Sequence, residues 1–265
     1  MINYVVYSHT DFLDVLRVQT DYIKSRGNIT LLINSNSLDV SDLYDSYDNV
    51  IFYEDTNSYA TKLLTSINQI TLDTFLFLHD NDILLNVDNT ILESLVSLVD
   101  VGVADRIDLR HTPVVGDSLV KVVEDGVWSD IPHSDVPSNS FCLVPQNDTG
   151  QYIYNVNPCI WRKDSFVDLL NNFPEKTYRN IEGLDVQTFC KKFNVYKLNS
   201  VNILECGYFK CLPLFTFLHI THFARLLLLN DNYVTEFGQS YADVSDEYIK
   251  IVNKYKLKLS PKWVN

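Results

Sequence analysis

Two aspartates separated by one residue, Asp80 and Asp82, directly follow an apolar run in this chain. Residues 74–78 show no polar alternation, which predicts a strand buried on both faces, as in a parallel sheet covered by helices. Ligands bind at the carboxyl ends of such strands, where this acidic pair falls. Because the carboxylates repel each other, we expect a divalent cation to bridge them or to bind one of them, and hard oxygen ligands favour Mg²⁺ or Mn²⁺ over zinc. The alternative is that residues 80–82 only form a turn.

The first hundred residues alternate strand and helix patterns. Strands are predicted at 3–7, 29–33, 50–53 and 74–78, and helices at 12–25, 40–47 and 59–70. This order predicts an α/β fold, in which a parallel sheet wound with helices forms a Rossmann-like nucleotide-binding half. Right-handed crossovers place the carboxyl end of every strand on one rim, so residues 8–11 should lie beside Asp80.

The second half of the chain is less regular. A helix is predicted at 89–98 and a strand at 101–109. Residues 111–151 are rich in Pro, Gly, Ser and Asp and lack a clear period, which predicts a long functional loop region. Periodic patterns return at 152–161, 165–170 and 186–193, and one or two amphipathic helices are predicted at 233–255.

Composition narrows the class of protein. The chain has 265 residues, of which 46% are hydrophobic and 12% aromatic, enough to fill a sizeable core. A net charge of −13 argues against a nucleic-acid partner. A nucleotide diphosphate remains compatible with this charge, because a metal ion and a few local cations neutralise it. Glycine-rich dinucleotide and P-loop motifs are absent from the sequence, which argues against NAD binding and P-loop phosphate transfer.

Compartment is indicated by cysteines and hydropathy. The five cysteines are odd in number and lack CxxC spacing, so we expect them to be reduced and the protein to be cytoplasmic. The N-terminus lacks the basic region and long apolar stretch of a signal peptide. The apolar stretch at 212–218 is interrupted by Pro213 and is too short to span a bilayer. We therefore expect a soluble protein without a transmembrane segment.

The chain resembles a GT-A glycosyltransferase over residues 1–225. The resemblance is carried by Asp80-Asn81-Asp82, by the start Tyr4-Val5-Val6-Tyr7-Ser8-His9, and by Asn180-Ile181-Glu182-Gly183-Leu184-Asp185-Val186. It implies a Rossmann-like GT-A fold with a mostly parallel central sheet flanked by helices. Residues 1–110 would be its nucleotide-binding half, 111–225 the half for acceptor and donor sugar, and 226–265 a C-terminal helical extension.

In that family at least one of the paired aspartates binds the Mn²⁺ or Mg²⁺ ion that bridges the diphosphate of the donor. The metal stabilises negative charge on the departing nucleotide diphosphate. Asp80 and Asp82 fit these positions. The resemblance also implies a C-terminal histidine that completes the metal shell, either His219 or His222. Arg225 follows His222 at helical spacing and would meet the diphosphate. The alternative is that these histidines belong to the core.

Glu182 and Asp185 are the candidates for a catalytic base. An inverting transferase needs a carboxylate near the acceptor hydroxyl to remove its proton. The family carries this base in an acidic motif at a helix start, and here the two residues are three apart, so either one could serve. The alternative is a helix capped by Asn180 with both carboxylates stabilised by the helix dipole.

The first β-to-α connection holds the nucleotide base and ribose in the family. The residues in question here are Ser8, His9, Thr10 and Asp11. An aspartate beside a ribose accepts hydrogen bonds from its hydroxyls. Thr10 and Asp11 would alternatively cap the next helix.

Trp161 is a further candidate from the resemblance. It would stack on the donor sugar or, equally, belong to the core.

The resemblance therefore implies a metal-dependent hexosyltransferase that uses a UDP-sugar or GDP-sugar and a glycan or glycoprotein acceptor, with inversion. A retaining enzyme would carry the same metal motif, with Glu182 or Asp185 holding the sugar. A sugar-nucleotide nucleotidyltransferase is a second hypothesis, although its usual glycine-rich basic loop is absent after Tyr7. A non-catalytic sugar-binding module, which would keep Trp161 without needing Asp80 and Asp82, is a third.

Overall fold

The computed structural model describes residues 2–34, 44–111, 118–124, 127–137, 141–146, 153–200, 215–219 and 250–257. The strands are β1 (Ile2–Tyr7), β2 (Gly27–Asn34), β3 (Asn49–Tyr53), β4 (Thr74–His79), β5 (Asp82–Val87), β6 (Arg106–His111), β7 (Leu119–Glu124), β8 (Val127–Pro132), β9 (Phe141–Pro145), β10 (Cys159–Arg162), β11 (Val195–Ser200) and β12 (Phe215–His219). The helices are α1 (Leu13–Ile23), α3 (Tyr59–Ile67), α4 (Asn89–Asp100), α5 (Lys163–Asn172) and α6 (Leu184–Cys190), with 3-10 turns η1 (Thr10–Phe12) and η2 (His133–Asp135). Residues 250–255 are also helical.

A ten-stranded sheet runs through the molecule in the order β3-β2-β1-β4-β10-β6-β11-β9-β7-β8. The first four strands are parallel neighbours, in the order of a Rossmann half. β10 lies antiparallel between β4 and β6, β6 and β11 are parallel, and the strands beyond β11 alternate in direction. Since only β10, β9 and β8 oppose the others, the predicted α/β fold with a mostly parallel sheet is confirmed.

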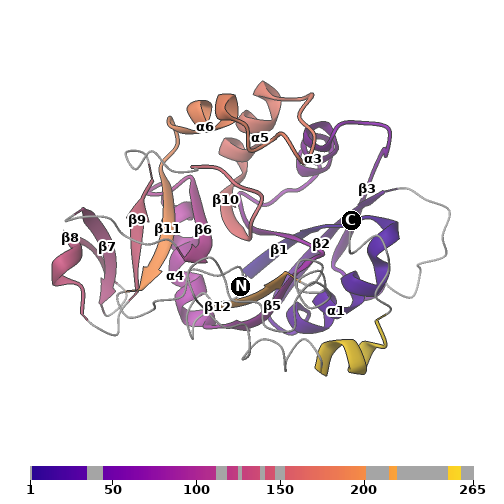
Figure 1. Ribbon diagram of the computed structural model, residues 1–265, viewed down its shortest axis with the longest axis horizontal. Coiled ribbons are helices and arrows are strands. Elements are labelled where there is room, and N and C mark those ends of the chain that lie inside the picture. The colour runs from indigo at the N-terminus through magenta and orange to yellow at the C-terminus, as the bar shows by residue number, and fades with distance from the viewer. Residues whose placement is uncertain are drawn as a thin grey trace, which may run out of the picture.

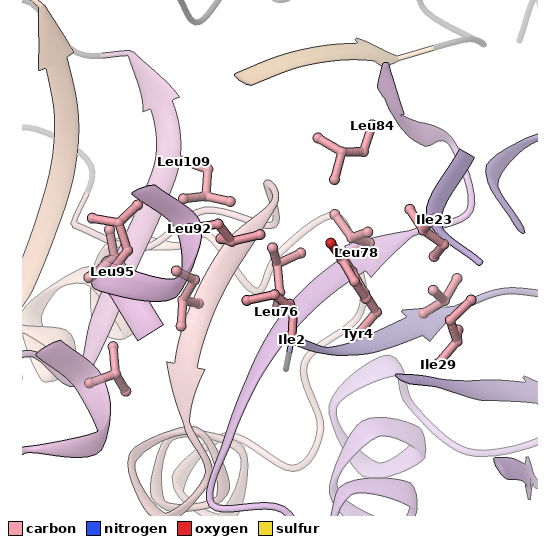
Figure 2. Packing of buried hydrophobic residues seen from close by; sticks show 14 of the residues in the cluster. Ile2, Tyr4, Ile23, Ile29, Leu76, Leu78, Leu84, Leu92, Leu95 and Leu109 are labelled. Carbon is pink, nitrogen blue, oxygen red and sulfur yellow. The ribbon is translucent and has the colours of Figure 1, made fainter. Parts of the chain in front are cut away.

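Helices cover both faces of the sheet (Figure 1). α1 and α4 pack on one face and α3, α5 and α6 on the other. Successive residues of a strand point to opposite faces, so Tyr4 and Val6 belong to the first core and Val5 to the second. Figure 2 shows Leu76 and Leu78 of β4 beside Tyr4 in the first core. Every residue of β4 is buried, as its unbroken apolar run predicts.

Residues at helix ends explain where α3 and α4 begin and why the strand predicted at 101–109 begins further along the sequence. The Ser58 and Asp88 side chains accept the first backbone N–H groups of α3 and α4, so these helices begin where the sequence predicts. α4 extends to Asp100 and ends near Gly102, which has a φ of 77°. The strand predicted at 101–109 therefore begins only at Arg106.

The prediction of an irregular region at 111–151 is wrong in part. This region contains β7, β8, η2 and β9, which extend the main sheet. β8 is at the edge of the sheet and most of its residues are exposed, so it lacks the apolar run that marks a buried strand. Half of the helix predicted at 40–47 lies outside the described residues, which begin again at residue 44, and residues 45–46 form a turn. Most of 233–255 also lies outside the described residues.

The chain leaves the main sheet immediately after β4. Asp80 and Asn81 form a turn, and β5 then pairs antiparallel with β12 in a separate two-stranded sheet. β5 packs against α1. Among the described residues, none of the helices has the length and apolar character needed to cross a bilayer.

Gly27 provides a test of the β1–β2 pairing. A Cβ atom at this position would lie 2.1 Å from the carbonyl oxygen of Ile2 and 3.1 Å from the ring of Tyr4. We expect Gly27→Ala to lower the free energy of unfolding by about 1–3 kcal/mol, because the backbone must move. Chemical denaturation measures this change. Gly183→Ala is the comparison variant and should lose less stability, since its Cβ would lie 2.9 Å from the end of the flexible Asp185 side chain and 3.1 Å from the Asn180 carbonyl oxygen, contacts that smaller shifts relieve. An equal loss in both variants would contradict the prediction.

Candidate functional site

The parallel part of the sheet has a topological switch point between β1 and β4. β1 pairs with β2 on one side and with β4 on the other, and ligands of such sheets bind in the crevice at the carboxyl ends of these strands. At this place the N–H of Asp80 donates to the carbonyl of Tyr7 (3.0 Å), and the Ser8 hydroxyl donates to Asp80 Oδ2 (2.8 Å). The sequence prediction that residues 8–11 lie beside Asp80 is confirmed for Ser8.

Both aspartates of the pair are buried in the connection between β4 and β5. Asp80 is 5% exposed and Asp82 is 6% exposed. The turn that the sequence allowed as an alternative does form, but a turn that served only to reverse the chain would leave its carboxylates in water. The arrangement is a buried acidic turn at the switch point.

Gln19 of α1 holds this turn in place. Its Nε2 donates to the carbonyl oxygens of His79 and Asp82, both at 2.9 Å. These two carbonyls flank the turn, and the Gln19 side chain is fully buried. One amide group therefore fixes both ends of the Asp80-Asn81-Asp82 segment.

The charge of Asp80 is only partly compensated. Burial raises the pKa of Asp80 to about 7, while hydrogen bonds from the Ser8 hydroxyl and from the backbone amides of His9 and Asn81 act in the opposite direction. In the part of the chain that the structure describes, Asp80 forms no salt bridge with a lysine or arginine. A cation beside this carboxylate would favour its ionised form.

His79 links Asp82 to a group of aromatic rings. Its Nδ1 lies 3.9 Å from Asp82 Oδ2, and its Nε2 is hydrogen-bonded to the Tyr59 hydroxyl at 2.7 Å. Burial lowers the pKa of His79 to about 4, and a hydrogen bond with the main chain of Val156 acts in the opposite direction. The imidazole is therefore neutral at physiological pH.

The aromatic rings come from several strand ends and from one later segment. Tyr7 stacks on Tyr53 with ring centroids 5.2 Å apart, and Tyr178 meets the rings of His79 and Tyr59 edge to face. Tyr178 is the exposed member, so it offers ring surface to a ligand at the rim.

Most side chains of the β1–α1 connection bind neighbouring strand ends. Asn34 Oδ1, at the end of β2, accepts the N–H of Thr10 at 2.8 Å, and its Nδ2 donates to the Thr10 hydroxyl at 3.1 Å. His9 Nε2 is 2.9 Å from Asp55 Oδ2, after β3. The Asp11 carboxylate is 71% exposed and lies 3.5 Å from His9 Nδ1. Of residues 8–11, Asp11 is the one whose side chain is most open to a ligand.

The proposed capping role of Thr10 and Asp11 is not what the structure shows. The side chain that caps η1 belongs to His9, whose Nδ1 accepts the N–H of Asp11 at 3.1 Å. α1 begins at Leu13 without a side-chain cap from Phe12.

Glu182 and Asp185 lie in different surroundings. Glu182 Oε1 accepts the N–H of Val156 at 2.7 Å, and Val156 is the residue whose main chain meets His79. A chain of contacts thus joins Glu182 to Asp82. Asp185 is 54% exposed and paired with Lys176 at 2.6 Å, which lowers the pKa of Asp185.

The segment that carries Val156 is fixed by a buried arginine. Arg106 of β6 donates to the carbonyls of Ile153 (2.8 Å) and Asn155 (2.9 Å) and to Asn155 Oδ1 (2.8 Å). Asn155 Nδ2 donates to Asp108 Oδ2 at 2.6 Å, and Asp108 lies 3.8 Å from Arg106. These hydrogen bonds hold residues 153–156 against the sheet.

Gln187 of α6 also binds this segment. It accepts the N–H of Tyr154 at 2.8 Å, donates to the Tyr154 carbonyl at 2.7 Å, and donates to the Glu182 carbonyl at 3.0 Å. The Gln187 amide therefore couples the position of Glu182 to that of residues 153–156. As with Gln19, a buried glutamine fixes the backbone next to a candidate acidic residue.

Trp161 belongs to the core. It is 1% exposed, stacks on Phe166 at a centroid distance of 5.0 Å and lies under the Arg106 guanidinium. A side chain this buried has no free face for a sugar, so of the two interpretations of Trp161 the structure supports the core residue.

The C-terminal candidates are placed only in part. The backbone of His219, in β12, is paired with that of Asp82 in β5, which brings this residue to the acidic turn. His222 and Arg225 lie outside the described residues. The possible roles of all three in binding metal or diphosphate remain predictions.

The donor set at the turn fits a hard divalent cation. Mg²⁺ usually keeps several waters and binds one or two carboxylates together with substrate phosphates, so two aspartates suffice. Within the described ranges, no three His, Cys, Asp or Glu side chains are grouped so as to enclose a metal by themselves. Asp80 and Asp82 would hold the ion, and a phosphate-bearing ligand would complete its coordination.

Sequence reasoning missed several residues of this site. Asn34 and His79 end strands, and Asp55 follows one, at the carboxyl edge of the parallel sheet. Their positions at the predicted strand ends were the signal that could have placed them at the site. Gln19 sits among the apolar positions of a predicted helix, and a polar residue there is unusual without a buried partner. No comparable signal marks Arg106 or Gln187, because their partners are distant in sequence.

No protein-family model matches the sequence, and no curated protein matches it. Solved structures similar in fold include TarS 1-349 from S. aureus, at a TM-score of 0.44 and 11% identity, with 99% of this chain and 76% of that chain covered. A cytidylyltransferase from Leptospira borgpetersenii has a TM-score of 0.48 and 11% identity, with 96% and 94% covered. A CMP:2-keto-3-deoxy-manno-octonic acid synthetase complexed with CTP has a TM-score of 0.42 and 14% identity, with 75% and 90% covered. Similarity of this size does not identify an activity.

The role of Gln19 can be tested by its removal. Gln19→Met keeps the length of the side chain but leaves the carbonyls of His79 and Asp82 without their donor. We expect the free energy of unfolding to fall by about 1–3 kcal/mol, because buried acceptors lose their hydrogen bonds. Gln69→Met removes an exposed amide and should change stability by less than about 0.5 kcal/mol. Equal values from urea denaturation of the two variants would contradict the role of Gln19.

Proposed function

We propose that this protein is a metal-dependent transferase of the GT-A type. It moves a hexose from a nucleotide diphosphate sugar to a hydroxyl group of a glycan or glycoprotein, with inversion at the anomeric carbon. The donor nucleotide is UDP, and GDP is the alternative. The observation that carries the proposal is the pair of buried carboxylates, Asp80 and Asp82, at the switch point of a Rossmann-type sheet.

The electrostatics of the turn support this function. A buried carboxylate with a raised pKa and no described cationic partner marks a candidate functional site. When Mn²⁺ or Mg²⁺ is bound there, it supplies the positive charge that stabilises the departing nucleotide diphosphate. Gln19 fixes the backbone at both ends of the turn that carries the two carboxylates, so the turn is preorganised.

The nucleoside is assigned to the rim formed by the β1–α1 connection and the aromatic rings. Asp11 has the exposed carboxylate that would accept hydrogen bonds from ribose hydroxyls. Tyr178 has exposed ring surface beside His79. Ser8, His9 and Thr10 shape this rim through their contacts with Asp80, Asp55 and Asn34.

Glu182 is the proposed base. It is tied to Val156, whose main chain meets His79 beside Asp82, whereas Asp185 faces solvent in a salt bridge that lowers its pKa and weakens it as a base. With one carboxylate oxygen fixed by the Val156 N–H, the other is available to accept the proton of the acceptor hydroxyl. The donated hydrogen bond also fixes the orientation of the carboxylate.

A nucleotidyltransferase that forms sugar nucleotides is the second candidate. It would use the same acidic turn to hold its metal ion. The β1–α1 connection contains neither glycine nor a lysine or arginine to cradle a triphosphate. That composition favours the glycosyltransferase.

Nucleotide binding tests the proposal directly. We expect UDP or GDP to bind in isothermal titration calorimetry when Mn²⁺ is present and to bind at least about tenfold more weakly without it, since the metal bridges carboxylates and diphosphate. An Asp80→Asn, Asp82→Asn double variant should lose the gain in nucleotide affinity that Mn²⁺ provides. Asp73→Asn, at the opposite end of β4, is the matched control and should bind like the wild type.

Each alternative has its own result in this experiment. Nucleotide binding that changes neither on removal of the metal nor in the double variant would contradict the assignment of Asp80 and Asp82 as the metal site. Tighter binding of CTP or UTP than of the diphosphates, with pyrophosphate released when a sugar 1-phosphate is added, would establish the nucleotidyltransferase instead. Metal-dependent binding without turnover of any nucleotide sugar would indicate a non-catalytic module.

The assignment of the base is tested by isosteric variants. Glu182→Gln keeps an oxygen for the Val156 N–H and should lower kcat for UDP release from the donor sugar by about 10²–10⁴-fold, with nucleotide affinity unchanged. Water serves as the acceptor in this assay. Asp185→Asn should stay within about threefold of the wild type, as expected for a residue outside the proton transfer. A larger loss of kcat in Asp185→Asn than in Glu182→Gln would instead identify Asp185 as the base.

A further inference from the structure

A second concave site lies at the amino ends of β1, β2 and β3, at the edge of the sheet opposite to Asp80. It is a pocket of about 380 Å³ whose wall is completed by residues 69–72, which connect α3 to β4. Its volume lies within the range of about 300–1,000 Å³ that is typical of small-molecule sites. All residues that line it belong to the described part of the chain.

The floor of this pocket is polar where a covered sheet is normally apolar. Asn3 pairs with Asn28, and Thr30 pairs with Asn49, so these four residues of three adjacent strands share one face. Further along the same face, Val5 and Leu32 belong to the core beneath α3. The polar positions therefore begin where the cover of the helix ends.

The amides of this floor retain capacity for a ligand. Asn28 Nδ2 donates to Asn3 Oδ1 at 3.4 Å, and each asparagine side chain can make several further hydrogen bonds. Gln69 adds another amide from the wall. Amide groups offer donors and acceptors together, which is what a ligand rich in hydroxyl groups requires.

The charge and the apolar walls narrow the class of ligand. Neither lysine nor arginine lines the pocket, and Asp48 is its only ionisable residue, with Oδ2 held by the N–H of Ile29 at 2.7 Å. An anion would therefore be repelled. Ile70 and Leu72 supply apolar surface that suits the C–H face of a sugar ring.

We propose that this amide-lined pocket binds a neutral saccharide. The ligand is a free sugar or the end of a glycan chain, held by its hydroxyl groups on Asn3, Asn28 and Asn49. The inference is independent of the transferase proposal, because none of these residues lies on the rim of Asp80.

The test is nuclear magnetic resonance of the ¹⁵N-labelled full chain. The probes are the methyl glycosides of glucose, galactose, mannose and N-acetylglucosamine, with glucose 6-phosphate and glucuronate as anionic comparators. We expect at least one neutral glycoside to shift the side-chain amide signals of Asn3, Asn28 and Asn49 in a saturable manner. The anionic sugars should bind at least about tenfold more weakly, as expected from the repulsion by Asp48.

Variants assign the effect to the pocket. Asn28→Leu combined with Asn49→Leu should abolish the shift of the remaining Asn3 side-chain amide, and both positions are exposed, so the fold should tolerate the change. Asn49→Asp is the second variant, which removes a donor and adds a charge without changing size, and it should weaken the shifts of Asn3 and Asn28. Asn171→Leu, at an exposed position of α5, is the matched control and should bind like the wild type. Shifts confined to the rim of Asp80, preference for the anionic sugars, or no saturable shift with any glycoside would each overturn the proposal.

Discussion

The burial of charge is the constraint on which this structure depends. A carboxylate taken out of water costs several kcal/mol unless a partner compensates for it, on the order of what a whole domain has to spare. Asp105 is paired with Arg162 and hydrogen-bonded to Ser165, and Asp108 is compensated by Arg106 and Asn155. Asp80 has no arginine or lysine partner among the described residues, and burial raises its pKa even though a hydroxyl and two backbone amides donate hydrogen bonds to it. This difference separates carboxylates whose charge is paired within the fold from one whose charge is only partly compensated.

The two halves of the candidate site are held by different parts of the sheet. The acidic turn is positioned by the parallel strands β1 and β4 and by the side-chain amide of Gln19 on α1. Glu182 is positioned through residues 153–156, which Arg106 and Gln187 both hold by hydrogen bonds. His79 and Val156 are where these two systems meet. The geometry of the site therefore depends on β6 and α6 as much as on the strand that carries the aspartates.

Local patterns in the sequence were enough to predict most elements of the N-terminal half, although not β5, which leaves the main sheet to pair with β12. The apolar run of β4 and the caps Ser58 and Asp88 act within a few residues, so β1 to β4, α3 and α4 were predictable, as was the position of Asp80. Features that depend on partners distant in sequence were not predictable. β8 is an exposed edge strand without an apolar pattern, and Trp161 could be assigned to the core only once Phe166 and Arg106 were placed around it.

The same limit applies to the acidic residues near α6. Glu182 and Asp185 look equivalent in the sequence, and only the contacts with Val156 and Lys176 distinguish them. Spacing along a helix start cannot report which carboxylate faces a strand end and which faces water. His219 is a further case, because its place opposite Asp82 follows from the pairing of β12 with β5.

The insertion of β10 between β4 and β6 has a consequence for how the protein is made. β4 is buried along its whole length, yet one of its edges is satisfied only by residues 159–162, about eighty positions later in the chain. Until a ribosome has synthesised β10, β4 is an apolar edge strand with unpaired backbone groups, the kind of surface on which nascent chains aggregate. The parallel part of the sheet formed by β1 to β4, although it is continuous in sequence, thus completes its pairing only after the following half of the chain has been made.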